Sequence, residues 1–473
     1  MPYDHDLVVI GVGPAGEKAA AQAAYFGKHV ACVERAAEPG GAAVHTGTLP
    51  SKTLRETAIF LSGFRQRELY GLSVEMKPDL AIPKLLSRKD AVRDQEVARM
   101  RWNLERHRVP ILKGVARFVD PHTIEVKDTG GTPRRVTSEV FLVATGSKPH
   151  HPEGIPFDDE DVDDSDTILQ IDRLPKSMLI VGGGVIGCEY ASMFAAMRVE
   201  VSLVEGRPRL MSFLDTEIAE RLRGAMQSLG VTFHLGQTTK GIRRVEGRGI
   251  VTTLASGQEI TTEKVLASSG RSGWTEGMGL SDVGVGVDKR GYITVDEAYR
   301  TAVPNIYAAG DVIGFPALAS TSMDQGRVAV CHAFGFTYKP QLSHLLPFGI
   351  YTIPEVSCVG FSEETAKEKN LDFVVGRAFY RDNARGKIVG DKDGVIKLVF
   401  DRGSRALIGC HCIGDRASEL VHIGQAAIML GGTVDTFIEM VFNYPTLSEL
   451  FKYAAYDALG AMGRKVEPAE AGT

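Results

Sequence analysis

Apolar and polar positions along the chain repeat in two units, each of which predicts a strand, a glycine turn, a helix and a second strand. The first unit begins with the apolar run Asp6–Ile10, passes through GVGPAG into an alanine-rich helix over Glu17–Phe26, and ends with the strand HVACVE at Glu34. The second unit reads MLIVGGGVIG, then CEYASMFAAM, then VEVSLVE, and ends at Glu205. This order, with an acid closing the second strand, is typical of a dinucleotide-binding unit. Two units predict two bound dinucleotides.

The remaining pattern predicts further elements around these units. An amphipathic helix is expected near Lys89–His107, followed by strands that end in FLVATGSKP. Short strands after the second unit end in VLASSGRS and TAVPNIYAAGDVIG. From about Leu345 the pattern changes to alternating strands such as GVIKLVF and ALIGCHCIG, with helices near Glu419–Met429 and Val434–Met440. We therefore expect an α/β fold with two Rossmann-like domains and a C-terminal α+β domain.

Composition limits the class of protein. The 473 residues carry 44% hydrophobic and 24% charged side chains, which is ordinary for a globular chain of roughly three domains. The net charge of -5 argues against a nucleic-acid partner, because such a surface is clustered and basic. The sequence contains no apolar run of about 18 residues, so no membrane span is predicted. The N-terminus shows no signal-peptide pattern, and a cytoplasmic protein is expected.

The six cysteines form no C-x-x-C pair, which favours a reducing compartment. Cys410 and Cys412 lie two residues apart in an apolar strand and so share one face of it. A metal or redox pair there is the alternative to buried, inert thiols, and the apolar surroundings favour inert thiols. No metal site is predicted.

The glycines of the two units have a physical role. Gly11, Gly13 and Gly16 let the backbone approach a pyrophosphate at a helix N-terminus, where free N–H groups favour anions. Glu34 then accepts hydrogen bonds from an adenosine ribose. The second unit supplies the same groups, namely Gly182, Gly184, Gly187 and Glu205. A chain that binds two dinucleotides is expected to pass a hydride between them.

These motifs resemble those of the flavoprotein disulfide reductase family along essentially the whole chain. The resemblance rests on GVGPAG with Glu34, on ATGSKP, on GGGVIGCEY, on the Gly270-Arg271 pair and on AAGDVIG. It implies that the first unit holds FAD and that the second holds NAD(H) or NADP(H). It also implies four segments: an FAD-binding domain at 1–150, an NAD(P)-binding domain at 151–275, the second part of the FAD domain at 276–344, and a dimerisation domain at 345–473.

The resemblance further implies roles for individual residues. Asp311 matches the aspartate that binds the flavin's ribityl chain, and Lys52 and Glu189 match an ion pair beside the flavin's reactive nitrogen. A cation there would oppose the negative charge of the reduced flavin. The other implied nucleotide contacts are Pro14, Ala15, Arg35, Gly41, Ala43, Ala144, Thr145, Gly146, Val185, Ile186, Gly270, Arg271, Gly310, Leu318 and Ala319.

Two departures from the family pattern remove its dithiol chemistry. The family segment GG-x-C-x4-C-x-P-S-K has Ala43 and Thr48 at its two cysteine positions in this chain. Near the C-terminus the family's catalytic histidine is replaced by Tyr444, although Glu449 remains. A tyrosine with a pKa near 10 is a poor proton shuttle at neutral pH. His45, in the loop between the glycines and the helix, is a possible flavin-site residue.

Without a disulfide, we expect reduced flavin to return its hydride to another nicotinamide nucleotide in a ping-pong transhydrogenation. The loop GGAAVHTGTLPSK and the segment FNYPT most resemble the transhydrogenating branch of the family, although that branch keeps a cysteine at the Ala43 position. Two alternatives are an NAD(P)H:quinone or acceptor oxidoreductase and a catalytically silent redox-sensing flavoprotein. The intact nucleotide motifs argue against the silent flavoprotein.

Nucleotide preference and assembly are also predicted. Glu205 favours the free 2′-hydroxyl of NAD and repels the 2′-phosphate of NADP. Arg207 and Arg209 follow it and could pair with a phosphate, or could simply be solvated. The resemblance implies a homodimer or higher homo-oligomer, in which Tyr444 and Glu449 approach the partner's flavin.

Overall fold

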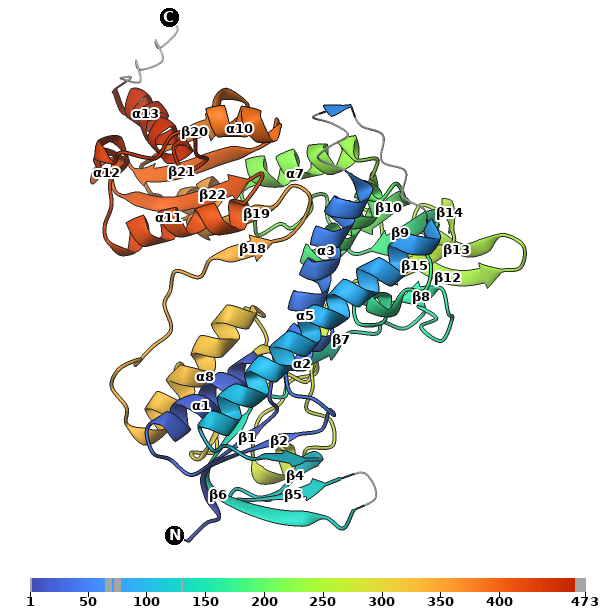
Figure 1. The fold of residues 1–473 in the computed structure, drawn as a ribbon, viewed down its shortest axis with the longest axis vertical. Helices are drawn as coiled ribbons and strands as arrows, with labels where there is room; N and C mark the ends of the chain where they lie inside the picture. Colours follow the sequence, from blue (N-terminus) through green and yellow to red (C-terminus); the bar gives the residue numbers. More distant parts are fainter. Residues whose placement is uncertain (1, 64–69, 72–77, 129–130, 464–473) are drawn as a thin grey trace, which may run out of the picture.

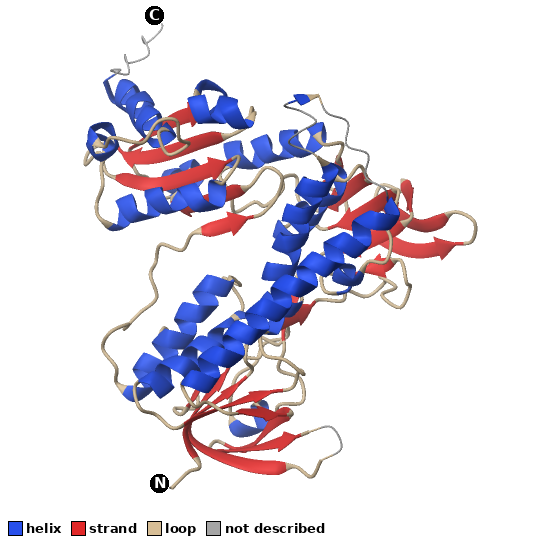
Figure 2. Cartoon of the chain, in the orientation of Figure 1, coloured by secondary structure: helices blue, strands red, loops and turns tan. Residues whose placement is uncertain are grey.

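A computed structural model describes residues 2–63, 70–71, 78–128 and 131–463 of the chain. The three largest sheets lie at three corners of the molecule, and helices lie between them (Figures 1 and 2). The first described residues lie beside the first sheet, and the last described helix, α13 (Leu450–Gly463), packs on the sheet of the C-terminal domain. The long helix α5 (Pro78–Arg106) runs diagonally between the first and second sheets.

The first sheet has seven strands in the order β3-β2-β1-β6-β5-β4, with β17 also paired to β6. Strand β1 is parallel to β2 and β6, as the first dinucleotide-binding unit requires. Helices α1 (Pro14–Tyr25) and α8 (Ala319–Phe334) pack together beside it; a Cβ on Gly326 of α8 would collide with the backbone oxygen of Ala15. The strands are β1 (His5–Ile10), β2 (Val30–Glu34), β3 (Ile111–Lys113), β4 (Val115–Asp120), β5 (Thr123–Lys127), β6 (Arg134–Val143) and β17 (Ile306–Ala308).

The second sheet has five parallel strands in the order β11-β10-β9-β15-β8. An antiparallel sheet of β12, β13 and β14 follows it, and the short pair β7 and β16 lies between the first two sheets. The helices of this part are α6 (Val185–Ala196) and α7 (Thr216–Ser228). The strands are β7 (Ser147–Pro149), β8 (Val162–Asp163), β9 (Ser177–Val181), β10 (Glu200–Glu205), β11 (Thr232–Leu235), β12 (Thr239–Val245), β13 (Gly249–Leu254), β14 (Glu259–Thr262), β15 (Lys264–Ala267) and β16 (Arg271–Gly273).

The C-terminal sheet is antiparallel, in the order β18-β19-β22-β21-β20. One face packs on helices of its own domain, and the other shares a core with α7 of the second unit. The strands are β18 (Phe348–Ile350), β19 (Val356–Gly360), β20 (Phe373–Phe379), β21 (Val395–Asp401) and β22 (Leu407–Ile413). The helices are α9 (Glu363–Glu368), α10 (Ala384–Val389), α11 (Ala417–Met429), α12 (Val434–Glu439) and α13 (Leu450–Gly463).

Two predicted elements differ from the structure. The segment expected to be a loop around His45 forms a short helix, α2 (Gly41–His45), before α3 (Thr48–Ser62). The helix predicted near Lys89–His107 begins at Pro78 and contains Pro83. A polar, proline-containing stretch carries a weak periodic signal, which is why the sequence indicates only its later part.

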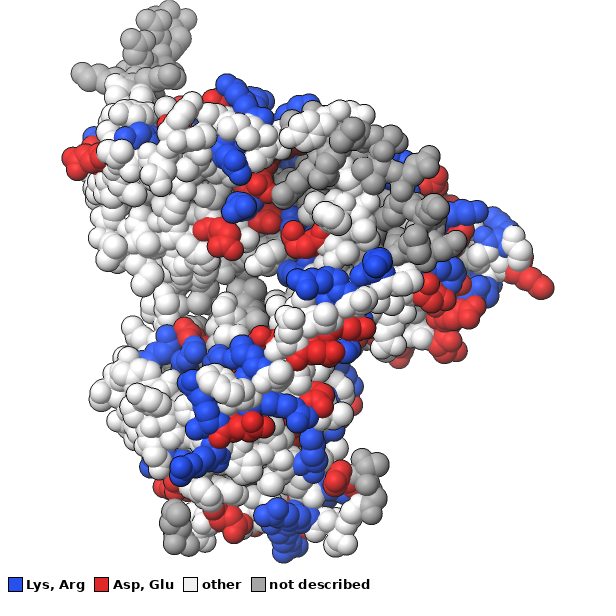
Figure 3. Space-filling view, in the orientation of Figure 1, with Lys and Arg blue, Asp and Glu red and all other residues white. Residues whose placement is uncertain are grey.

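Acidic and basic side chains are interleaved over both halves of the face drawn in Figure 3. Within the described ranges, no helix is long and apolar enough to cross a bilayer.

Candidate functional site

The first glycine turn is shaped to receive a dinucleotide. Gly11 has φ +99°, and a Cβ there would collide with the carbonyl of Ala144. Gly13 precedes α1 and provides no side-chain cap, so the first-turn N–H groups have no intrahelical acceptor. A Cβ on Gly16 would collide with the oxygen of Gly11. Only glycine keeps this close helix–strand contact while leaving the helix N-terminus open.

The acid at the end of β2 holds this turn in place. Glu34 accepts hydrogen bonds from Val12 N at 2.8 Å and from Ala36 N at 2.9 Å. Nearby, the hydroxyls of Thr145 and Ser322 are buried and have no hydrogen-bond partner within the described chain. Unpartnered buried hydroxyls are costly, and a polar ligand in this turn would satisfy them. These groups fit the predicted FAD.

A second helix N-terminus lies beside the same turn. Helix α8 begins at Ala319 after Leu318, again without a side-chain cap. Gly310 has φ +83° and donates to Gln325 Oε1 at 2.9 Å, and a Cβ on it would lie 3.1 Å from that of Ala15. Pro14 and Ala15 open α1. The two helix N-termini therefore meet where the predicted FAD residues gather.

Asp311 belongs to a polar chain that links three segments. Ser147 Oγ donates to Asp311 Oδ2 at 3.0 Å and accepts from Arg271 Nε at 2.8 Å. Arg271 also pairs with Asp166 at 3.2 Å. Burial raises the pKa of the Asp166 carboxyl, although Arg271 opposes that rise. Asp311 and Arg271, predicted separately, are thus brought together through Ser147.

The segment after Glu34 makes an aromatic contact that the sequence does not predict. Arg35 follows Glu34, and its guanidinium carbon lies 3.0 Å from the ring centre of Trp274. Trp274 N donates to Gly146 O at 3.0 Å. Gly146 (φ +73°) and Gly270 (φ +95°) occupy the left-handed region at these turns. Arg35 is therefore held by stacking rather than by a carboxylate.

The second glycine turn repeats the geometry of the first. Gly182 has φ +104°, and a Cβ there would lie 2.6 Å from Ser268 O. A Cβ on Gly187 would collide with the Gly182 oxygen, whereas Gly184 faces open space. Val185 and Ile186 begin α6, which has no side-chain cap. The turn fits a second pyrophosphate.

The acid of the second unit is fixed by backbone donors. Glu205 accepts from Gly183 N at 2.6 Å and from Arg207 N at 2.9 Å. Arg209 is bonded to Thr216 Oγ1 and, at 2.9 Å, to Ser212 O. Of the two candidate phosphate partners, Arg209 is therefore already engaged in the loop.

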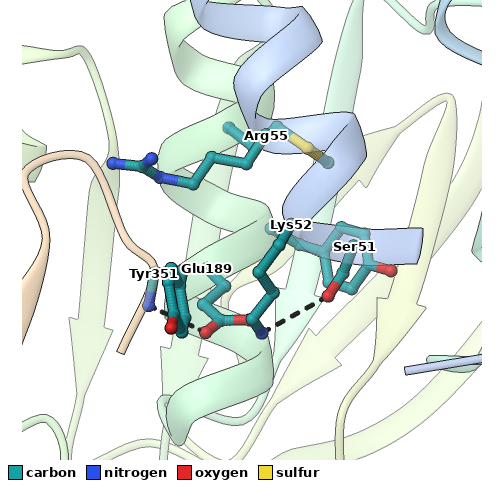
Figure 4. Close-up of a pocket in the computed structure, with 7 residues that line it drawn as sticks. Ser51, Lys52, Arg55, Glu189 and Tyr351 are labelled. Carbon is teal, nitrogen blue, oxygen red and sulfur yellow. Dashed lines mark hydrogen bonds and ion pairs between the residues drawn. The ribbon is translucent and has the colours of Figure 1, made fainter. Parts of the chain in front are cut away.

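The predicted ion pair is present. Lys52 on α3 and Glu189 on α6 meet with an Nζ–Oε2 distance of 2.7 Å (Figure 4). Tyr351 N donates to Glu189 Oε1 at 2.9 Å, and Lys52 Nζ lies 5.0 Å from the Tyr351 ring centre. Burial raises the pKa of the Tyr351 phenol. The pocket around this pair joins the FAD segment, the second unit and the C-terminal domain.

Arg55, one turn after Lys52, fixes this junction. Its Nε donates to Thr352 O at 3.0 Å, and its Nη1 pairs with Glu355 at 3.2 Å. Residues three apart on a helix share a face, so Lys52 and Arg55 both contact the segment that carries Tyr351. These contacts between α3 and the Tyr351 segment keep Lys52 and Glu189 in position.

The frame around the missing cysteines serves the first glycine turn. Gly40 N donates to Val12 O at 2.7 Å, and a Cβ on Gly41 (φ +56°) would lie 2.9 Å from Gly13 Cα. Ala43 and Thr48 lie on α2 and at the start of α3. His45 Nε2 donates to Pro39 O at 2.9 Å, a bond that fixes the fold of this segment.

The two C-terminal site candidates lie apart from this pocket in the single chain. Tyr444 is 74% exposed. Glu449 accepts from Asn383 Nδ2 at 3.2 Å and from Tyr453 OH at 3.3 Å. The charge of Glu449 raises the pKa of Tyr453. Neither residue contacts Lys52 or Glu189 within the described part of the chain.

All six cysteines are buried and unpaired. Cys410 and Cys412 lie side by side on β22 with their sulfurs 3.8 Å apart, as the strand pattern predicts. On the neighbouring strand β19, burial raises the pKa of the Cys358 thiol to about 12. Such thiols are inert. The described residues hold no cluster of three metal-ligating side chains.

Several contacts were not predicted from the sequence. Ser147, Trp274 and Tyr351 come from segments distant in sequence from the residues that they contact, and Gln325 lies 15 residues after Gly310, from which it accepts a hydrogen bond. Tyr351 lies in GIYTIPE, which resembles a family motif, but nothing in that motif identifies Glu189 as its partner. Only the tertiary fold shows these contacts.

Two models of one protein family match almost the whole chain. Residues 5–326 match the model described as pyridine nucleotide-disulphide oxidoreductase. Residues 346–455 match the dimerisation domain of the same family.

Individual relatives are similar over comparable lengths. A soluble pyridine nucleotide transhydrogenase of Mycobacterium bovis is 47% identical over 462 residues, covering 97% of this chain and 98% of the relative. One from a Marinomonas species is 40% identical over 95% of this chain and 97% of its own. The crystal structure of LpdA from Mycobacterium tuberculosis superposes with a TM-score of 0.87 at 27% identity, covering 95% and 99% of the two chains.

Proposed function

This chain belongs to the pyridine nucleotide-disulphide oxidoreductase family, and from that premise we propose that it is an FAD-dependent transhydrogenase for NAD(H) and NADP(H). FAD, when bound, accepts a hydride from one nicotinamide and returns it to another. In the forward direction NADPH loses a hydride and NAD⁺ gains it, giving NADP⁺ and NADH with no net proton.

One observation carries the proposal: the flavin frame is intact and the thiol relay is gone. The Lys52–Glu189 pair and both glycine turns are formed, whereas Ala43 and Thr48 stand at the two cysteine positions. All six cysteines are buried elsewhere in the structure. A hydride that reaches this site has no disulfide to reduce, and a second nucleotide is the acceptor that the second unit is built to bind.

The residues divide the work between binding and charge placement. The first turn, with Glu34, Arg35, Thr145 and Asp311, would hold FAD, while Gly182–Gly187 and Glu205 would hold the nicotinamide nucleotide. Lys52 places a positive charge beside the reacting ring, and Glu189 and the Tyr351 backbone keep that charge in position. His45 and Thr48 would support the flavin loop rather than transfer protons.

Nucleotide preference follows from the β10 turn. The Glu205 carboxylate is fixed by Gly183 and Arg207 backbone donors, so its charge stays where a 2′-phosphate would lie. Because Arg209 is engaged, Arg207 is the residue left to pair with that phosphate. We infer that NADH binds more tightly than NADPH and that NADPH depends on Arg207.

We also propose that the domains meet near residues 150, 275 and 344 and that the protein is a homodimer. Val441 is 93% exposed and lines a groove after α12, and Tyr444, three residues later, is 74% exposed. We propose that a second copy covers this surface in a homodimer and brings Tyr444 and Glu449 toward the partner's flavin. The buried free thiols support a cytoplasmic location.

Steady-state turnover tests the proposal. The FAD-loaded protein is given NADPH and thio-NAD⁺, an acceptor whose reduced form absorbs at its own wavelength. We expect continuous thio-NADH formation with parallel double-reciprocal plots, the pattern of a ping-pong exchange. If NADH or NADPH is oxidised only when a quinone is added, the protein is an acceptor reductase instead. If neither assay turns over although FAD is bound, the redox-silent alternative replaces it.

A further inference from the structure

Three phenylalanine rings from distant parts of the chain meet in one cluster. The ring centres of Phe315 and Phe348 lie 6.0 Å apart at an interplanar angle of 19°, and those of Phe213 and Phe348 lie 5.8 Å apart at 44°. Phe315 is 82% exposed and Phe213 is 51% exposed. Large apolar rings grouped at the surface commonly mark a binding site.

Phe213 belongs to the loop that closes the second glycine turn. This loop follows Glu205, and Met211 N donates to Gly183 O at 3.3 Å. A Cβ on Gly183 would lie 2.8 Å from Leu210 Cδ2. The loop that presents Phe213 therefore packs directly on the predicted phosphate-binding turn.

Phe315 belongs to the loop that carries Asp311. It lies four residues after that carboxylate and four before Ala319, the first residue of α8. Gly314, which precedes it, has φ +89° and packs near the ring of Tyr292. Phe315 is thus presented to solvent from the loop that contacts the predicted flavin.

Phe348 connects the cluster to the ion pair. It begins β18, and its carbonyl accepts from Ser357 Oγ at 2.7 Å. Three residues later, Tyr351 N donates to Glu189. The three rings therefore stand on the nucleotide loop, the flavin loop and the strand beside the Lys52–Glu189 pair.

We propose that Phe213, Phe315 and Phe348 form a stacking platform for the nicotinamide half of the nucleotide substrate at the entrance to the hydride-transfer pocket. The inference rests on the proposed function and names a subsite within it. A flat nicotinamide ring stacks on an exposed phenylalanine face. The oxidised ring is also a cation, which an aromatic face attracts, so the platform favours NAD(P)⁺ over the reduced form.

This preference suits an exchange reaction. The Lys52 ammonium repels the cationic ring of an oxidised nicotinamide inside the pocket. The phenylalanine rings at the entrance therefore provide a favourable contact for an incoming oxidised nucleotide. The occupant is the nucleotide because two of the three segments carry predicted dinucleotide contacts and the third lies beside the Lys52–Glu189 pair. The alternative occupant, a second copy of the chain, would make Phe315 part of a subunit interface.

The test uses the FAD-loaded full chain with Phe315→Ala and Phe315→Leu. Phe26→Ala is the matched control, because Phe26 is also an exposed ring in an aromatic contact, 4.8 Å from Phe336, but lies at the opposite end of α1 from the glycine turn. Dissociation constants for NAD⁺ and for NADH are measured from perturbation of the flavin spectrum and from anaerobic stopped-flow reduction. FAD content and sedimentation are measured for each variant.

We expect the dissociation constant for NAD⁺ to rise about fivefold in Phe315→Ala, with a smaller rise for NADH. Phe315→Leu should behave like the alanine variant, because it keeps apolar area without a ring face. FAD content and subunit assembly should be unchanged. A change of less than twofold for NAD⁺, or loss of the dimer in the Phe315 variants, would overturn the platform. The proposed function fails separately, if wild-type flavin reduced by one nucleotide is not reoxidised by the other.

Discussion

The proposed mechanism depends most on one side chain, the positively charged Lys52. Lys52 reaches across from α3 to Glu189 on α6, and Glu189 is 7% exposed. An ion pair this enclosed keeps its geometry and is weakly screened. The charge that we propose stabilises hydride transfer is therefore in place before any nucleotide arrives.

Replacement of Lys52 by methionine should remove this charge while keeping the length of the side chain. We expect the rate of flavin reduction by NADH to fall about 100-fold, measured by anaerobic stopped-flow spectrophotometry at saturating NADH. Lys52→Arg should retain part of the rate. Lys240→Met, on the exposed hairpin strand β12, is the control. A rate within threefold of wild type in Lys52→Met, with normal FAD content, would show that the charge is not used.

Glu205 should set the choice between the two nucleotides. Glu205→Gln keeps a carbonyl oxygen for one of the two backbone donors but removes the charge that faces the 2′ position. We expect kcat/KM for NADPH relative to NADH to rise about tenfold, equivalent to about 1.4 kcal/mol. Glu200→Gln, at the opposite end of the same strand, should leave the ratio unchanged. An unchanged ratio in Glu205→Gln would locate specificity elsewhere.

At the scale of elements, the C-terminal sheet is fastened to the second unit by buried charges. Lys397 on β21 is 1% exposed and contacts Asp215 at 2.8 Å, Glu363 at 2.6 Å and Glu217 at 3.2 Å. Asp215 caps α7, while Glu363 begins α9. This junction holds the C-terminal sheet, whose edge strand β18 directly precedes Tyr351, against the unit that contains α6 and Glu189.

Lys397→Met should therefore destabilise the fold strongly, because it removes the buried cation that pairs with the buried Asp215 carboxylate. Glu217 and Glu363 keep the more exposed Arg377 as a partner. We expect a loss of about 3–5 kcal/mol in the free energy of unfolding, measured by urea denaturation. Lys367→Met removes an exposed lysine that also pairs with Glu363, at 3.7 Å, and should cost less than about 0.5 kcal/mol. Equal effects of the two substitutions would contradict this account.

The same cluster predicts a pH dependence. Burial alone lowers the pKa of Lys397, but its hydrogen bonds to Asp215 and Glu363 outweigh that and raise the pKa above its ordinary value. The stabilisation is then complete below the unfolded pKa of about 10.4 and is lost as pH rises through the higher folded value. Unfolding measured from pH 8 upward should show an alkaline loss that Lys397→Met lacks. An equal alkaline loss of stability in the wild-type protein and in Lys397→Met would show that Lys397 is not the titrating group.

The sequence predicts the elements whose signals are local. Both glycine turns and Glu34 and Glu205 follow from a strand–turn–helix pattern within about 30 residues. Helix α2 was not predicted, because Gly40 and Gly41 indicate a turn and the packing on Gly13 that orders them is tertiary. The contact of Tyr351 with Glu189 and that of Phe213 with Phe348 join segments more than 100 residues apart, which no local pattern reports.

At the scale of the whole molecule, we expect two chains to associate through the exposed apolar surface at the end of α12. Val441→Glu places a charge where 93% of an apolar side chain is now exposed. We expect the dimer to dissociate, observed as a halved mass in sedimentation or light scattering. Val119→Glu, at a 44% exposed valine on β4, is the control. A stable dimer in Val441→Glu would place the interface on another surface.

The central claim is that the reduced flavin returns its hydride to a nicotinamide nucleotide. The most direct measurement is anaerobic reduction of the purified protein by NADH and separately by NADPH, followed by addition of the other oxidised nucleotide. We predict that both nucleotides bleach the flavin absorbance, NADH at lower concentration, and that NADP⁺ or NAD⁺ then restores it rapidly. Reduction by NADH alone, with recovery only after a quinone is added, would contradict transhydrogenation and make the protein an acceptor reductase.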